Sequence, residues 1–154
     1  MIKIGVINIS DRASAGEYED LPGKEVLSLL NGYLKSEWEK EYAIIPDEQH
    51  LIEKKMIEFA DDQGCCLIIT TGGTGPTLRD VTPEATESVS EKMMPGFGEL
   101  MRTTSQFSMV HKRFDNKVTD LELKIFRNGM RVGSHVGNFT SFIQFLSYDH
   151  GLVY

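Results

Sequence analysis

The feature that most constrains this chain is a glycine-rich turn near its middle, where an apolar run ends. Residues 67–71 are apolar and β-branched, which predicts a buried strand. Gly72, Gly73 and Gly75 follow within four residues. A glycine backbone can take positive φ and lie directly against a ligand, and successive free N–H groups in such a turn bind anions. The sequence therefore predicts a site for a phosphorylated ligand at the carboxyl end of a sheet.

Polar residues flank the glycine turn. Thr71 and Thr74 offer hydroxyl groups, while Arg79 and Asp80 offer a cation and a carboxylate able to bind magnesium. Thr82 stands immediately before a proline that can open a helix. We therefore expect Thr82 to cap that helix, to bind phosphate, or to do both.

The net charge of −7 limits the ligands and partners of this chain. A nucleic-acid-binding face would be basic, so the charge argues against a nucleic-acid partner. An anionic substrate would need help from a metal, an arginine or backbone amides. No apolar run approaches the length needed to span a membrane, so no membrane partner is expected. Cys65 and Cys66 would point to opposite faces of one strand, which indicates two reduced thiols in the cytoplasm.

Strand and helix patterns alternate through the first half of the chain. We expect strands over residues 2–9, 41–46 and 65–71, and helices over 21–35 and 50–62. This alternation predicts right-handed crossovers and a parallel sheet. Farther along, the patterns predict helices over 84–94 and from 95, strands over 118–126 and 130–136, a turn at 127–129 and a helix over 139–148. The length of 154 residues favours one domain, 1–154.

Two further polar clusters follow predicted strands. Ser10, Asp11 and Arg12 lie at the carboxyl end of the first strand, either as ligands at the sheet edge or as an ordinary turn. Asp47 follows the second strand. It can cap the next helix, or it can place a carboxylate at the same edge as the glycine turn. Taken singly, these residues leave both choices open.

The central loop and four other stretches together resemble the molybdopterin adenylyltransferase family of the MogA/MoaB type, which is related to the G domain of gephyrin. The stretches occur in the family's order, at residues 10–14, 18–20, 45–48, 70–86 and 94–102. A lone glycine turn would be a weak signal, whereas this ordered set is a strong one. The MogA branch fits better than the MoaB branch.

The resemblance implies a molybdopterin-binding fold, an α/β fold with three layers in which a mostly parallel sheet carries helices on both faces. It implies a cytoplasmic homotrimer that acts late in molybdenum cofactor biosynthesis. The implied reaction is the Mg-ATP-dependent adenylylation of molybdopterin, which gives adenylylated molybdopterin and pyrophosphate. A molybdenum-insertion protein is then an expected partner. Because two anions must meet in line, the task of the protein is positioning and charge neutralisation.

The resemblance also assigns roles to residues. Asp47 and Asp80 match the two functional aspartates of the family, and we expect both to be catalytic and to lie near the magnesium ion and the reacting phosphates. A metal turns two carboxylates, which alone would repel ATP, into a clamp. The other expected substrate- or nucleotide-binding residues are Ser10, Asp11, Thr71, Gly72, Gly73, Thr74, Gly75, Thr82 and Ser141.

The tail departs from the family pattern from about residue 103. The family motif that binds the pterin reads Asn-Leu-Pro-Gly-Lys-Pro-x-Ser, and residues 134–141 read Ser-His-Val-Gly-Asn-Phe-Thr-Ser. Gly137 and Ser141 keep the register, but neither proline is present, and the chain ends earlier than the family pattern. A diverged domain end and a shifted reading frame would both produce such a tail.

Two other functions stand beside adenylyl transfer. The altered tail is compatible with a catalytically weak module that binds molybdopterin or a nucleotide. A flavodoxin-like or Rossmann-like cofactor binder is the third class, and the lack of G-x-G-x-x-G after the first strand counts against its dinucleotide form.

Overall fold

The computed structural model describes residues 1–96, 99, 121–127 and 130–136, and the side chains up to residue 96 together with that of residue 99. The elements in chain order are β1 (Ile2–Ile9), α1 (Asp11–Ser14), α2 (Leu21–Tyr33), β2 (Trp38–Ile45), α3 (Gln49–Ile57), the π-helix η1 (Glu58–Asp62), β3 (Leu67–Thr71), α4 (Thr82–Ser88), β4 (Lys92–Met93), β5 (Leu121–Arg127) and β6 (Met130–Val136). None of the described helices has the length and apolar character needed to cross a membrane.

The described strands form one mostly parallel sheet in the order β2-β1-β3-β5-β6-β4. β1 pairs in parallel with both β2 and β3. β5 runs antiparallel to β3 and to β6, and β4 runs parallel to β6. β5 is therefore the one described strand that opposes the others, and the prediction of a mostly parallel sheet is confirmed.

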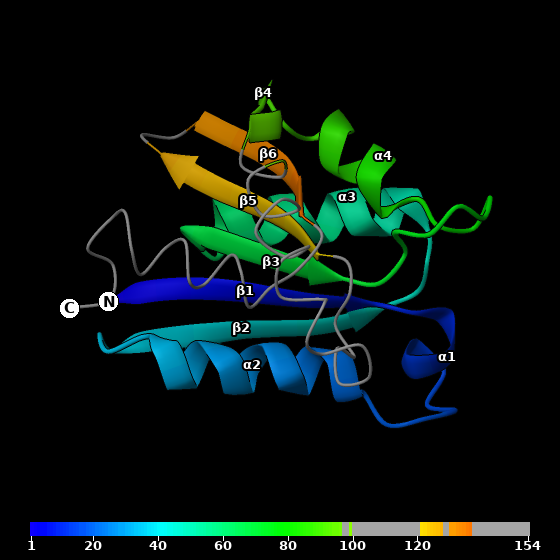
Figure 1. Ribbon diagram of the computed structural model, residues 1–154, viewed down its shortest axis with the longest axis horizontal. Coiled ribbons are helices and arrows are strands. Elements are labelled where there is room, and N and C mark those ends of the chain that lie inside the picture. The colour runs from blue at the N-terminus through cyan, green and yellow to red at the C-terminus, as the bar shows by residue number, and fades with distance from the viewer. Residues whose placement is uncertain (97–98, 100–120, 128–129, 137–154) are drawn as a thin grey trace.

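The two faces of β1 carry two separate apolar clusters. Ile4 and Val6 pack with Val26 and Leu30 of α2 on one face. Ile7 and Ile9 belong to a second cluster that includes Ile52 and Met56 of α3 and Ala85 of α4. Figure 1 shows the resulting three layers, with α2 on one side of the sheet and α3 and α4 on the other. A strand buried on both faces needs apolar side chains in nearly every position, which is the pattern the sequence of β1 shows.

Long-range pairing moved several predicted boundaries. The helix expected over 84–94 ends at Ser88, because Lys92 and Met93 form β4 against Val132 and Gly133 of β6. β2 begins at Trp38 instead of Glu41, since it pairs with the full length of β1. Local periodicity does not report such pairings. The expected strand from 130 to 136 matches β6. Of the turn expected at 127–129, Arg127 ends β5, while residues 128–129 and the helix expected over 139–148 lie outside the described residues.

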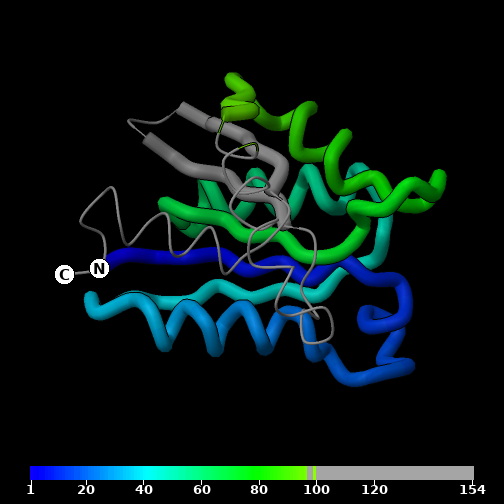
Figure 2. The backbone as a smooth tube through the Cα atoms, viewed as in Figure 1, coloured from blue at the N-terminus to red at the C-terminus, as the bar shows by residue number. Residues whose placement is uncertain are grey.

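The direction of the strands places three loops together. β1, β2 and β3 are adjacent and run the same way, so the segments that follow them leave from one edge of the sheet. Figure 2 shows these segments, which lead to α1, α3 and α4, at the same end of the molecule. The carboxyl edge of a parallel sheet is where open α/β folds bind ligands.

Candidate functional site

The glycine turn is shaped by its contact with the end of β1. Gly72 has φ +95 and Gly73 has φ +63, a region that favours glycine. A Cβ added to Gly72 would lie 2.0 Å from the carbonyl oxygen of Ile9. A Cβ on Gly73 would lie 2.3 Å from Oγ1 of Thr82. Both glycines are therefore required by the packing of the turn, before any ligand is considered.

Thr82 supports the turn from inside the protein. Its side chain is completely buried, its Oγ1 donates to the carbonyl of Gly72 at 2.9 Å, and its N–H donates to the carbonyl of Gly73 at 3.0 Å. The prediction that Thr82 caps α4 was wrong: Val81 occupies the cap position, and no side chain caps the helix. The hydroxyl of Thr82 is engaged by the turn, and the residue presents no surface to a ligand.

Asp47 and Asp11 hold the ends of two neighbouring strands together. The N–H of Asp11 donates to Oδ2 of Asp47 at 2.8 Å, and the N–H of Asp47 donates to Oδ1 of Asp11 at 3.0 Å. Asp47 does not cap α3, because Glu48 occupies that position without a side-chain bond. A Cβ on Gly73 would lie 2.9 Å from Oδ1 of Asp47, so this carboxylate borders the glycine turn. Of the two interpretations of Asp47, the structure supports the carboxylate at the sheet edge.

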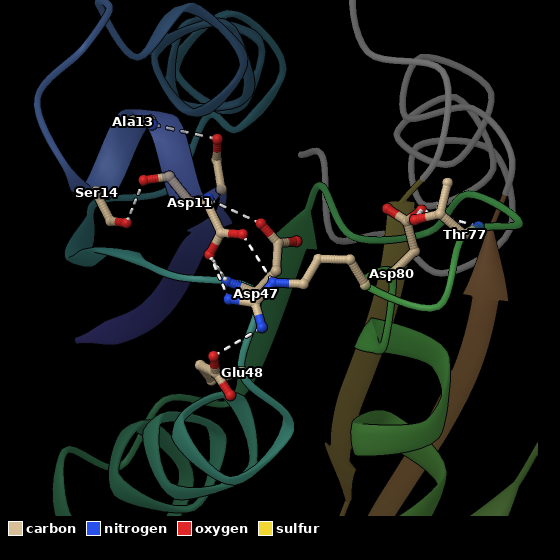
Figure 3. Close-up of polar contacts among 9 residues, drawn as sticks. Asp11, Ala13, Ser14, Asp47, Glu48, Thr77 and Asp80 are labelled. Carbon is tan, nitrogen blue, oxygen red and sulfur yellow. Dashed lines mark hydrogen bonds and ion pairs between the residues drawn. The ribbon is translucent and has the colours of Figure 1, made fainter.

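Asp80 lies on the other side of the glycine turn. Its Oδ2 accepts hydrogen bonds from the N–H of Thr77 at 3.1 Å and from the Thr77 hydroxyl, and its own N–H donates to the Thr77 carbonyl at 3.1 Å. A Cβ on Gly75 would lie 3.0 Å from Oδ2 of Asp80. Figure 3 shows Asp11, Asp47 and Glu48 as one group and Asp80 with Thr77 as another. The two expected catalytic aspartates thus border one glycine turn, at Gly73 and at Gly75.

Arg79 connects these groups, a contact that sequence reasoning missed. Its Nε and Nη2 donate to the two carboxylate oxygens of Asp11 at 2.8 and 2.9 Å. Its Nη1 lies 2.8 Å from Oε1 of Glu48. The available signal was chain position, since Glu48 and Arg79 each adjoin one of the two expected aspartates. Nothing in the local pattern showed that a residue after β3 reaches the loops after β1 and β2.

The other expected site residues have different surroundings. Ser10 caps α1 by accepting from the N–H of Ala13 at 3.3 Å, and its hydroxyl also lies 2.8 Å from that of Tyr18. Thr71 is buried at the end of β3, whereas Thr74 is half-buried and Gly75 is exposed. Ser141 lies outside the described residues. Ser10 and Thr74 are therefore partly exposed at the carboxyl edge of the sheet, while Thr71 is buried beneath that edge.

The carboxylates of the site differ in their electrostatics. Hydrogen bonds from the Arg79 guanidinium and from the Asp47 amide lower the pKa of Asp11. The Thr77 hydroxyl lowers the pKa of Asp80. Burial raises the pKa of Asp47, and the negative charges of Asp11 and Asp80 add to that effect. Asp47 is therefore the carboxylate whose charge is least well compensated.

The carboxylates of the site suit a metal ion whose remaining ligands are substrate phosphates and water. In the described part of the chain, no three His, Cys, Asp or Glu side chains are grouped so that they could hold a metal. Asp47 and Asp80 supply two carboxylates beside a turn rich in amides. Magnesium is commonly bound by one or two carboxylates together with substrate phosphates and water. The residues present therefore fit a magnesium–phosphate complex better than a metal held by protein alone.

Comparisons with known proteins show the family of the chain. Residues 5–137 match the family described as a probable molybdopterin binding domain. The chain belongs to this family. Solved structures of similar fold include the molybdopterin biosynthesis enzyme MoaB from Thermus thermophilus, at 28% identity and a TM-score of 0.70 over 99% of this chain and 94% of that one. The Mog protein from Mycobacterium ulcerans, at 21% identity over 99% and 97% of the two chains, shows the same fold with a TM-score of 0.68.

Curated relatives of the chain share a shorter stretch with it. A molybdopterin adenylyltransferase from Helicobacter pylori (strain ATCC 700392 / 26695) is 59% identical over 104 residues, which are 68% of this chain and 59% of that protein. The enzyme of the same name from Escherichia coli (strain K12) is 48% identical over 104 residues, 68% of this chain and 53% of that protein. The chain thus spans little more than half the length of these relatives, within a fold that belongs to the probable molybdopterin binding domains.

The close contact at Gly72 predicts a large loss of stability in Gly72→Ala. The substitution combines positive φ with the carbonyl of Ile9, and we expect a loss of about 2–4 kcal/mol in the free energy of unfolding. Gly16→Ala is the matched control, because Gly16 has φ +75 but nothing lies within 4 Å of its added Cβ. It should lose only about 1–2 kcal/mol. Denaturant unfolding measures both, and equal losses would show that the Ile9 contact can relax.

The raised pKa of Asp47 predicts a stability that depends on pH. A carboxyl whose pKa is higher in the folded protein costs no stability below its unfolded pKa, near 3.8, and destabilises the fold once the pH rises above its folded pKa. Asp47→Asn removes this cost and retains an oxygen that accepts from Asp11. The variant should therefore melt above the parent protein at pH 7, and the difference should shrink towards pH 4. A lower melting temperature at pH 7 would contradict the effect of burial.

Proposed function

We propose that the chain is a molybdopterin adenylyltransferase. The observation that carries the proposal is the glycine turn bordered by Asp47 and Asp80, in a chain that shares 48–59% identity over 104 residues with proteins of that name. In the reaction, an oxygen of the terminal phosphate of molybdopterin forms a bond to the α-phosphorus of ATP. The bond from that phosphorus to pyrophosphate breaks, and adenylylated molybdopterin is the product.

Each part of the edge has a role in such a reaction. The amides of the turn from Gly72 to Gly75 bind phosphate oxygens, which the negative net charge of the chain would otherwise repel. Asp47 and Asp80 would hold magnesium, which when bound neutralises charge on the phosphates. Asp11 orients Asp47 through the two reciprocal hydrogen bonds. These residues position two anions in line, and positioning is the main contribution of a protein to phosphoryl-type transfer.

Other features of the family belong to the same proposal. We assign the chain to the cytoplasm and to a homotrimer that uses Mg²⁺ and delivers its product to a molybdenum-insertion protein. We retain Ser10 and Thr74 as binding residues, since Ser10 follows β1 at the same edge of the sheet and Thr74 is part of the turn. Ser141 is retained as a contact to the pterin, because the motif around it keeps the spacing from Gly137.

A second candidate function is binding without efficient turnover. Two observations favour it. The sequence identity with the adenylyltransferases covers only 104 residues of the chain, and the motif at 134–141 lacks both prolines of the family. Prolines reduce the ordering entropy that a loop loses on binding. Incubation with molybdopterin, ATP and magnesium separates the two functions, since adenylylated molybdopterin forms only if the chain is an enzyme.

The tail predicts a split between the two substrates. We expect the affinity for Mg-ATP to match that of full-length relatives, and the affinity for molybdopterin and the rate of product formation to be lower. A chimera that joins residues 1–102 to a tail with the family motif should restore both. Calorimetry with each ligand and product analysis test this prediction. If the parent chain and the chimera turn over equally well, the residues that keep the register are sufficient.

The position of Asp80 predicts that Asp80→Asn folds but does not react. Asparagine retains an oxygen that accepts from the N–H of Thr77, so the melting temperature should change little. Loss of one carboxylate of the magnesium clamp should reduce adenylyl transfer by about 100-fold or more. Asp62→Asn, at an exposed position of η1, is the control for a lost charge and should keep full activity. A folded Asp80→Asn protein with unchanged turnover would remove Asp80 from the catalytic site.

A further inference from the structure

The segment that carries Asp80 is exposed along most of its length. Gly75 to Arg79 are exposed, and the side chain of Leu78 is fully open to solvent. At its base the segment is anchored by Thr82, which bonds to the carbonyls of Gly72 and Gly73. The hydrogen bonds between Thr77 and Asp80 lie within the segment itself and fix its curvature only. These contacts do not determine how far Asp80 lies from the loops after β1 and β2.

Arg79 supplies the contacts that fix the distance between the 74–81 segment and the loops after β1 and β2. Among the described residues, every hydrogen bond and ion pair from residues 74–81 to those two loops comes from its guanidinium. Two of its nitrogens bind Asp11, and the third binds Glu48. Asp11 and Asp47 in turn each donate a backbone N–H to the other's carboxylate. A continuous chain of polar contacts therefore runs from the residue beside Asp80 to Asp47.

We propose that Arg79 is a positioning residue that sets the separation of Asp47 and Asp80 by tying the 74–81 segment to the loops after β1 and β2. Its use in adenylyl transfer rests on the function proposed above. The tie itself is a property of the free protein. Because of this tie, the two carboxylates, which come from different loops, are held in one site before a ligand arrives.

The shape of the guanidinium explains why this position holds arginine. Its planar fork binds both oxygens of Asp11 and leaves the remaining nitrogen for Glu48, whereas a lysine ammonium acts as a single point charge. Charge alone would be served by either residue. Four carboxylates gather at this edge, at Asp11, Asp47, Glu48 and Asp80. Arg79 keeps them at fixed positions in addition to offsetting part of their repulsion.

Three variants test the proposal: Arg79→Lys, Arg79→Gln and Glu48→Gln. The first measurement is amide hydrogen exchange of residues 74–81 in the protein without ligand. We expect exchange to be about tenfold faster in both Arg79 variants, because each loses charged hydrogen bonds that contribute about a factor of ten or more. Glu48→Gln keeps an accepting oxygen but removes the charge from one of the three contacts, so its exchange should lie between that of the Arg79 variants and that of the parent protein. Lys55→Gln, which breaks the 2.7 Å ion pair between Lys55 of α3 and Glu58 of η1, should leave this exchange unchanged.

The second measurement is the binding of a non-hydrolysable ATP analogue with magnesium. Both Arg79 variants should bind about tenfold more weakly, and lysine should not rescue glutamine, since geometry and not charge is lost. Rescue by lysine, or unchanged exchange in Arg79→Gln, would overturn the proposal. Tighter binding by Glu48→Gln would also overturn it, because a guanidinium released from Glu48 would then be acting as a direct ligand of phosphate. If the parent protein binds no Mg-nucleotide while exchange rises in the Arg79 variants as expected, the proposed function is wrong and the positioning role of Arg79 is confirmed.

Discussion

The site depends on the approach of Gly72 to the carbonyl oxygen of Ile9. A Cβ at this position would come within 2.0 Å of that oxygen, so only glycine lets the chain leave β3 directly against the end of β1. The turn then passes Thr82 and Asp47 at Gly73, and reaches Asp80 at Gly75. The glycines thus let the turn lie against both carboxylates. Packing alone therefore requires glycine at these positions.

Much of the fold follows from the sequence because its central elements are buried on both faces. β1 has the predicted bounds, since a continuous apolar run can be nothing but an interior strand in a chain that alternates strand and helix. β4 was missed because it consists of two residues whose strand character comes from pairing with β6. Edges and short strands are defined by their partners. Local pattern therefore predicts the centre of this sheet better than its margin.

The site was predictable to the extent that residues act through their position after a strand. The glycines were expected at the carboxyl edge of the sheet from the pattern. For Asp11 and Asp47 the pattern left both choices open, and the resemblance to the family favoured the edge. The roles of Thr82 and Arg79 were not predictable in this way. Thr82 fits a helix cap by every local rule, but its hydroxyl is taken by the carbonyl of Gly72, ten residues earlier. Arg79 acts on Asp11 across 68 residues of sequence, a distance over which spacing carries no information.

Asp47 and Asp80, the two aspartates beside the glycine turn, differ in how well their negative charges are stabilised. Asp80 is stabilised as a carboxylate by the hydroxyl and amide of Thr77, whereas burial and two neighbouring negative charges disfavour the charge on Asp47. A cation placed between them would relieve the repulsion at Asp47, while Asp80 would have to share its oxygens with Thr77. If the site binds a metal–phosphate complex as proposed, the cost of holding Asp47 ionised in the free protein would become part of the driving force for binding, because the ligand would remove a penalty that folding has imposed.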